Sequence, residues 1–188
     1  MERHALGNLI AIRGNHEEMM VGATTGDIAR ASWLEYGGTE TLRSYGVRRP
    51  EKIDDIQAAI DPTHWRFIQE DCVDYHETAT HFFVHAGAEP DLALEDQDPQ
   101  VLRWKRFHGA RPHMSGKIMV CGHTPQATGL PSSVGHAVCI DTGVYARGGW
   151  LTCLDIQTGE FWQANQKGAI HRNSLYGKFA TEPESLGI

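Results

Sequence analysis

Arg13-Gly14-Asn15-His16-Glu17 is the stretch that decides the fold of this chain. It follows an apolar run, residues 8–13, that predicts a buried strand, and it leads into residues 17–23, which predict a short helix. Asn15 and His16 would then lie at the carboxyl end of a strand, where open α/β sheets build their sites. An amide oxygen next to an imidazole suits metal-assisted hydrolysis, whereas the alternative interpretation is a Gly-Asn turn followed by a surface histidine.

The composition indicates one soluble globular domain. The 188 residues are enough to build a core, and the net charge of -7 argues against a nucleic-acid partner, which needs clustered Lys and Arg. No apolar run approaches the roughly 20 residues that cross a bilayer, so we expect no membrane partner. The cysteines are far apart and mostly lie in apolar runs, so we expect reduced thiols and a cytoplasmic location: Cys72, Cys121, Cys139 and Cys153.

The periodicity of the chain changes near residue 71. Residues 24–71 read as helices interrupted at Gly37-Gly38, and we interpret this stretch as a helical cap or insertion. Beyond it we expect a helix at 100–107 and strands at 72–76, 81–85, 117–121, 136–141, 150–155 and 160–164. Residues 165–188 are predicted to be a tail without regular structure. Residues 1–188 therefore form a single predicted α/β domain.

Two further strand ends carry histidine as the first one does. His85 follows the apolar run that ends at Val84, and His123 follows the run that ends at Cys121. Parallel neighbouring strands would bring Asn15, His85 and His123 to one edge of the sheet. Nitrogen and oxygen donors that converge there suit a divalent transition metal. The sequence therefore predicts a metal site built from these three side chains.

The three motifs together resemble a known family. Gly-Asn-His-Glu at 14–17, His-Ala-Gly at 85–87 and Gly-His-Thr-Pro at 122–125 are similar to the phosphoprotein phosphatase branch of the calcineurin-like metallophosphoesterases, of bacterial and phage type. The similarity covers about residues 8–164. It implies a metallo-dependent phosphatase fold of two packed β-sheets flanked by helices, and a hydrolase that removes phosphate from phosphoserine or phosphothreonine proteins. Two metal ions (Mn, Fe or Zn) would hold a bridging hydroxide that attacks phosphorus in line.

The resemblance also implies roles for individual residues. Asn15, His85 and His123 match the terminal ligands of one metal, and His16 matches the general acid that protonates the leaving oxygen. Arg106, in a Trp-x-Arg pattern, matches a catalytic, phosphate-clamping arginine, with Arg103 as the fallback. Two more substrate-binding candidates at the mouth of the site, for which a solvated-surface interpretation stays open, are Arg13 and Tyr145.

Two motifs of the family, Gly-Asp-x-His-Gly and Gly-Asp-x-x-Asp-Arg-Gly, have no counterpart in this sequence. They supply the carboxylates and the first metal site, so at most one site is partly present here. We expect an N-terminally truncated form of a longer protein, with a natural fragment as the alternative. We also expect weak metal binding, no two-metal catalysis from this chain alone, and self-association through an exposed sheet edge.

Three rival functions remain open at this point. A symmetrical bis(5'-nucleosyl)-tetraphosphatase shares the same motifs and would act on a small phosphoester substrate. A non-catalytic binding module would have kept the fold and lost the active centre. A structural zinc protein would use a different set of four donors, which shares His123 with the first: Cys121, His123, His136 and Cys139.

Overall fold

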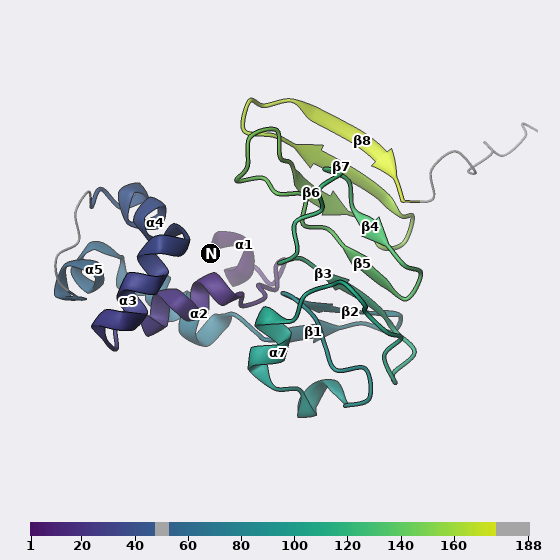
Figure 1. Cartoon of the computed structure of the whole chain (residues 1–188), viewed down its shortest axis with the longest axis horizontal. Helices are drawn as coiled ribbons and strands as arrows, with labels where there is room; N and C mark the ends of the chain where they lie inside the picture. The colour runs from purple at the N-terminus through teal and green to yellow at the C-terminus, as the bar shows by residue number, and fades with distance from the viewer. Residues whose placement is uncertain (48–52, 176–188) are drawn as a thin grey trace, which may run out of the picture.

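The computed structural model describes residues 1–47 and 53–175 of the chain. It shows a mixed α/β protein in which a group of helices lies on one side and two β-sheets on the other (Figure 1). The helices are α1 (Glu2–Ala5), α2 (Asn15–Gly22), α3 (Asp27–Trp33), α4 (Thr39–Ser44), α5 (Ile53–Ala59), α6 (Pro62–Arg66) and α7 (Pro99–Trp104). The strands are β1 (Tyr75–Glu77), β2 (His81–Val84), β3 (Ile118–Cys121), β4 (Ser132–Ser133), β5 (Ala137–Cys139), β6 (Leu151–Leu154), β7 (Glu160–Ala164) and β8 (Ile170–Ser174).

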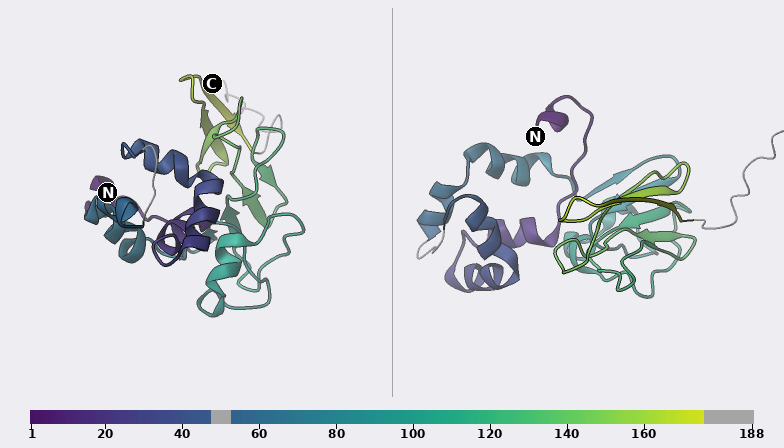
Figure 2. Two further views of the ribbon diagram at one scale, coloured as in Figure 1. Left: turned by 60° about the vertical axis from the view of Figure 1, so that its left-hand side comes forward. Right: turned by 90° about the horizontal axis from the view of Figure 1, so that it is seen from above.

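The larger sheet is mixed, with the order β1-β2-β3-β5-β4 among the described residues. Its central strands β2, β3 and β5 are parallel, and β1 and β4 are antiparallel to their neighbours. The smaller sheet is antiparallel, with the order β6-β7-β8. The two sheets lie next to each other, on the opposite side of the molecule from α3 and α4 in Figure 1 and in the right-hand view of Figure 2. The predicted α/β class and the hairpin of β1 and β2 are confirmed.

Two separate apolar clusters hold the described residues together. The sheet cluster packs one face of the larger sheet against α7 and its flanking loops, with Phe82 fully buried at its centre. The helical cluster gathers side chains from α2 to α6 around Trp33, which is 1% exposed. Helix α2 is shared by the two halves of the molecule, because its Met20 belongs to the helical cluster while its first turn lies nearest the sheets (Figure 1).

The helical pattern of residues 24–71 is confirmed for the described positions. The predicted interruption at Gly37-Gly38 lies between α3 and α4, where Gly37 has a φ of 102°, a backbone conformation that side chains larger than glycine rarely adopt. Helix α6 begins with Pro62 after Asp61, whose carboxylate accepts a hydrogen bond from the backbone N–H of Thr63 at 2.8 Å. Both features follow from ordinary helix-end chemistry.

The predicted strand at residues 8–13 is wrong. Only one parallel bridge forms, between Ile12 and Val73, and Leu9 and Ile10 remain 43% and 49% exposed. An apolar run becomes a regular strand only when it finds partners for its backbone groups on a neighbouring segment. Within the described residues this segment finds one such contact, so it stays extended but irregular.

The prediction of a structureless tail is also wrong, as far as residue 174. Residues 170–174 form β8, which pairs antiparallel with β7 along five residue pairs, from Glu160–Ser174 to Ala164–Ile170. Arg172 pairs with Glu160 at 2.6 Å and lies over the ring of Trp162 at 5.5 Å. The rest of the tail prediction, residues 176–188, lies outside the described residues.

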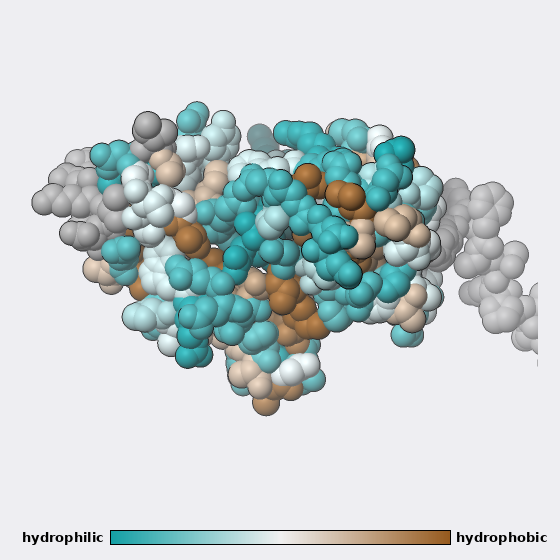
Figure 3. Space-filling model, turned by 90° about the horizontal axis from the view of Figure 1, so that it is seen from below, coloured by the Kyte–Doolittle hydropathy of each residue, from teal (hydrophilic) through white to brown (hydrophobic). Residues whose placement is uncertain are grey.

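The surface is largely hydrophilic on the face shown in Figure 3, with a small apolar patch near the middle of that face. None of the helices in the described part of the chain is long and apolar enough to cross a membrane.

A buried arginine connects the elements around the sheet edge. Arg103, on α7, pairs with Glu18 of α2 at 2.7 Å and with Asp74, just before β1, at 2.5 Å. Its side chain is only 11% exposed, so the guanidinium charge is compensated mainly by these two carboxylates. This network fixes α2 against α7 and therefore sets the positions of the residues at the start of α2.

We expect Arg103→Met to lower the free energy of unfolding by about 2 kcal/mol in urea titrations. Removing one partner of a fully buried pair costs about 3–5 kcal/mol, and the value here is smaller because water reaches both carboxylates. Arg111→Met is the matched control, since Arg111 and Asp91 form an exposed pair that should contribute less than about 1 kcal/mol. Equal losses in the two variants would contradict the structural role of Arg103.

The network should also weaken in acid. Burial acts to raise the pKa of Glu18, but hydrogen bonds from Arg103, Gln100 and Trp104 outweigh it, so the pKa lies below the usual 4.5. A carboxylate with a lowered folded-state pKa stabilises the fold above its unfolded-state pKa and loses this effect as the pH falls through the folded value. The stability difference between wild type and Arg103→Met should therefore shrink below about pH 4.

Candidate functional site

The carboxyl ends of β2 and β3 bring His85 and His123 together. The two strands are parallel neighbours, His85 directly follows β2, and His123 lies two residues beyond β3. The backbone N–H of Gly122 donates to the carbonyl oxygen of His85 at 2.8 Å, which ties the two strand ends to each other. The ring centroids of the two histidines are 5.1 Å apart. Both imidazoles therefore lie at the sheet edge where the sequence predicts them.

Asn15 joins the two histidines from α2. It is the first residue of that helix and is 5% exposed, and its Oδ1 lies 2.8 Å from Nε2 of His85. The helix starts here because Gly14 caps it and the carboxylate of Glu17 accepts a hydrogen bond from the backbone N–H of Gly14 at 2.9 Å. The three predicted metal ligands, which are far apart in sequence, thus converge on one place in the fold.

Gly14 is needed for this close approach. A Cβ atom added to it would lie 2.7 Å from Nδ1 of His85 and 2.8 Å from Oε2 of Glu17. Such distances are shorter than van der Waals contact, so the imidazole would have to move. The Gly of the Gly-Asn-His-Glu stretch therefore allows the helix start to lie against the ring of His85.

We expect Gly14→Ala to displace the His85 ring and to lower the free energy of unfolding by about 1–3 kcal/mol. The ring displacement can be measured from the imidazole carbon and proton chemical shifts of His85. Gly22→Ala is the matched control on the same helix, since an added Cβ there meets nothing within 4 Å. Unchanged His85 shifts in Gly14→Ala would show that the contact is not tight.

His123 adopts an unusual backbone conformation. Its φ of 61° is in the left-handed region, and no other non-glycine residue of the described ranges has a positive φ. Such strain persists where surrounding contacts fix it, and it is concentrated at functional sites. The ring hydrogen-bonds to the backbone of Trp104 and lies 6.1 Å, centroid to centroid, from the indole ring of the same residue. This hydrogen bond engages one ring nitrogen and leaves the other available to a ligand.

The surroundings of both imidazoles lower their pKa and so favour the neutral form. Burial, and then the neighbouring charges of His123 and His16, lower the pKa of His85 to about 4. Burial also lowers the pKa of His123, with a further contribution from Arg106, and the hydrogen bond to the Trp104 backbone and the Asp141 carboxylate partly oppose it. A neutral imidazole keeps the lone pair that a metal ion needs, so the electrostatics favour ligation over ion pairing.

The donor geometry fits a divalent metal ion in part. Two donors that each lie about 2.1 Å from one ion are separated by roughly 3 Å, which is close to the distance between Asn15 Oδ1 and His85 Nε2. The donors are neutral, however, and no cluster of three or more His, Cys, Asp or Glu side chains suited to a metal is found in the described ranges 1–47 and 53–175. Asn15, His85 and His123 could hold one ion weakly.

The predicted catalytic residues lie at the rim of this cluster. His16 is exposed in the first turn of α2, and Arg106 is exposed just beyond the end of α7. The charges of both act on the pKa of His123, which places them near its ring. Neither side chain makes a hydrogen bond or an ion pair with the part of the chain that the structure describes. Both are thus free to contact a ligand.

The other predicted arginines are engaged elsewhere. The guanidinium of Arg13 donates to the carbonyl oxygens of Gln69 and Cys72, at 2.5 and 3.4 Å. Arg103, the alternative to Arg106 as the phosphate-binding arginine, forms the ion pairs with Glu18 and Asp74 described above. Tyr145 is 74% exposed and lines a separate cavity of about 220 Å³.

The zinc alternative is not supported by the geometry. Cys121 and Cys139 are paired in register on β3 and β5, and their thiols hydrogen-bond to each other. His136 is directed elsewhere, with its Nε2 2.9 Å from the carbonyl oxygen of Ala110. The four proposed ligands therefore do not share one centre.

Sequence reasoning missed the residues that support the cluster. Glu17 could have been identified, because a Glu three residues after a helix cap is a known capping pattern. The roles of Trp104 and Asp141 carry no local signal, since they depend on how α7 and the strand ends meet. Comparison of the sequence with protein-family models and with curated proteins finds no match.

Proposed function

We propose that Asn15, His85 and His123 bind one divalent metal ion, and that the chain is part of a calcineurin-like metallophosphoesterase of the phosphoprotein phosphatase type. Its substrates would be phosphate monoesters, with phosphoserine and phosphothreonine in proteins as the first choice. The observation that supports this is the convergence itself: Asn15 Oδ1 lies 2.8 Å from His85 Nε2, and the His85 and His123 rings are 5.1 Å apart at the ends of parallel strands.

The rim residues have the chemistry for the remaining roles. When bound, the metal would act as a Lewis acid on a phosphoryl oxygen. Arg106 presents a free planar guanidinium, which can bind two phosphate oxygens at once. His16 is solvent-exposed on the first turn of α2 and can donate a proton to the leaving oxygen.

The chain by itself would bind metal weakly and would have no two-metal activity. Its three donors carry no charge and one of them is an amide, so no carboxylate among them offsets the charge of a bound dication. In a form of the protein that supplies these carboxylates, the same site would be complete. The manganese affinity of this chain is therefore the direct test of the proposal.

The test compares Asn15→Asp with wild type by titrating Mn²⁺ and following free ion by electron paramagnetic resonance. The substitution keeps the side-chain volume and adds a carboxylate where the amide oxygen now lies, so the affinity should rise by about tenfold or more. Asn173→Asp, on the exposed strand β8, is the control and should leave the affinity unchanged. If the two variants behave alike, the metal site is not at Asn15.

Substrate class is separated by a second assay. The assay uses saturating Mn²⁺ and a form of the protein that supplies the carboxylates missing from the metal site. It compares the hydrolysis of phosphoserine peptide, p-nitrophenyl phosphate and a dinucleoside tetraphosphate. Preference for the phosphopeptide supports the proposal, and preference for the dinucleotide supports the tetraphosphatase alternative. Metal binding without turnover on any of the three would indicate a non-catalytic module.

A further inference from the structure

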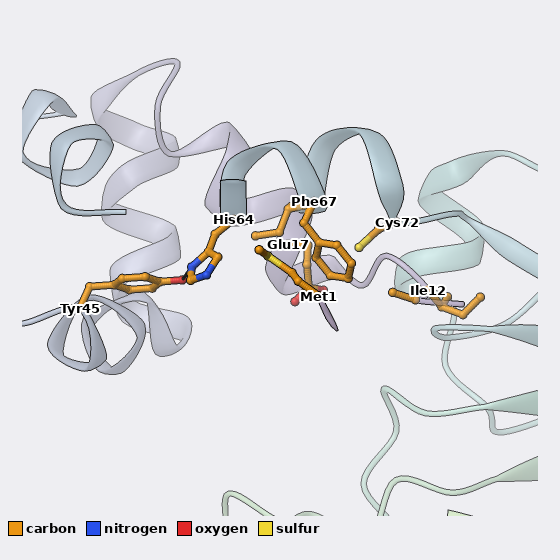
Figure 4. A pocket seen from close by; sticks show the side chains of 9 residues that line it. Met1, Ile12, Glu17, Tyr45, His64, Phe67 and Cys72 are labelled. Atoms are coloured by element: carbon orange, nitrogen blue, oxygen red, sulfur yellow. Dashed lines mark hydrogen bonds between the residues drawn. The ribbon is translucent and has the colours of Figure 1, made fainter. Parts of the chain in front are cut away.

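A cavity of about 420 Å³ lies behind the start of α2, among the helices. Figure 4 shows Tyr45 and His64 at one end, Cys72 and Ile12 at the other, and Glu17 and Phe67 between them. Its volume is within the range of small-molecule sites in proteins, which are mostly apolar with a few polar groups. None of its lining residues belongs to the proposed metal ligands.

The polar groups of the cavity are fixed in place. The hydroxyl of Tyr45 and Nδ1 of His64 are 2.7 Å apart, and the two rings are in edge-on contact. Glu17 is held by the backbone N–H of Gly14, which binds its Oε2 at 2.9 Å. A site whose polar groups are already oriented loses little conformational entropy when a ligand binds.

The charge of Glu17 acts on the Cys72 thiol at one end of the cavity. Burial raises the pKa of the Cys72 thiol, and the Glu17 carboxylate raises it further, with Arg13 opposing and Asp71 adding to the effect. Of the residues that line the cavity, Glu17 is the acidic one; Met1 and His64 also line it, and Lys and Arg are absent from this lining. The aromatic rings of Tyr45 and Phe67 add faces that attract cations. Glu17 and these rings are therefore the groups of the lining that can hold a cation.

We propose that this cavity binds an organic amine, with the ammonium group at Glu17 and an aromatic or aliphatic body against Ile12, Phe67 and Ile68. The carboxylate and the rings would hold the cation, and the apolar side chains would bury the body of the ligand. The site does not require a metal ion, so it stands independently of the phosphoesterase proposal.

The test uses tryptamine as the probe and isothermal titration calorimetry of the full chain. Tryptophol, with a hydroxyl in place of the ammonium, and indole-3-propionate, with a carboxylate, are the matched ligands. Tryptamine should bind at least about fivefold more tightly than tryptophol, and the carboxylate should bind weakest. Equal binding of all three, or no binding of tryptamine, would overturn the proposal.

Two variants locate the site. Glu17→Gln keeps an oxygen that can accept the Gly14 N–H and removes the charge, and Ala11→Leu fills part of the cavity without changing charge. Each substitution should lower the affinity for tryptamine by about fivefold or more, while the circular dichroism spectrum stays that of wild type. Tryptamine binding that is unchanged in both variants would place the ligand elsewhere and refute the assignment.

Discussion

His123→Ala is expected to abolish measurable Mn²⁺ binding, whereas His16→Ala should leave it within about twofold of wild type. The two histidines differ in position. The ring of His123 faces His85 and is oriented by the backbone of Trp104, while His16 is exposed at the rim. Loss of an outer-shell partner already costs roughly 10–100-fold in metal affinity, so loss of a direct ligand should cost more.

The same titration that follows free Mn²⁺ measures this difference. His136→Ala is the control, because this imidazole contacts the carbonyl oxygen of Ala110 and takes no part in the cluster. In a form of the protein that turns over substrate, His16→Ala should lose activity far more than metal content. Equal loss of metal in His16→Ala and His123→Ala would contradict the roles proposed for them.

The placement of the two histidines at neighbouring strand ends could be predicted from the sequence. Each follows a short apolar run that ends at a turn, and runs of this kind form the central strands of parallel sheets. The structure confirms the strands and their parallel pairing. The prediction worked because burial on both faces of a strand leaves a local signal in the sequence.

Other parts of the site had no such signal. The left-handed backbone of His123 depends on how the chain leaves β3 and on the contact with Trp104, which lies 19 residues earlier in the chain. The capture of Arg103 by Glu18 and Asp74 likewise depends on three elements meeting in space. A sequence pattern identifies candidate phosphate-binding arginines, and only the fold decides which of them is free.

The errors in the predicted secondary structure have the same origin, which is contacts between segments that are far apart in the sequence. The run 8–13 is apolar enough for a strand but finds a single backbone bridge, to Val73, among the described residues. Strand β8 is too polar to be predicted and forms because β7 offers its backbone groups, with support from Trp150, whose ring lies 4.4 Å from that of His171. Edge strands depend on the partner that is present more than on their own composition.

Trp33→Ala is expected to lower the free energy of unfolding by about 3–5 kcal/mol, the range for removing a large aromatic side chain from a core. Trp33 is 1% exposed at the centre of the helical cluster, and Gly38 lies so close that an added Cβ would be 2.5 Å from its ring. Urea titration followed by circular dichroism measures the loss. Ser32→Ala, at an exposed position of the same helix, should change stability by less than about 0.5 kcal/mol.

The same variant tests whether the two clusters unfold together. The helical and sheet clusters share no residue, so amide hydrogen exchange in Trp33→Ala should accelerate in α2 to α4 and stay slow in β2 and β3. Because α2 carries both Met20 of the helical cluster and Asn15 of the site, the loosened helix should also weaken Mn²⁺ binding. Equal acceleration in β3 would show instead that the whole chain unfolds as one unit, and the metal site would then depend on the helical cluster only through global stability.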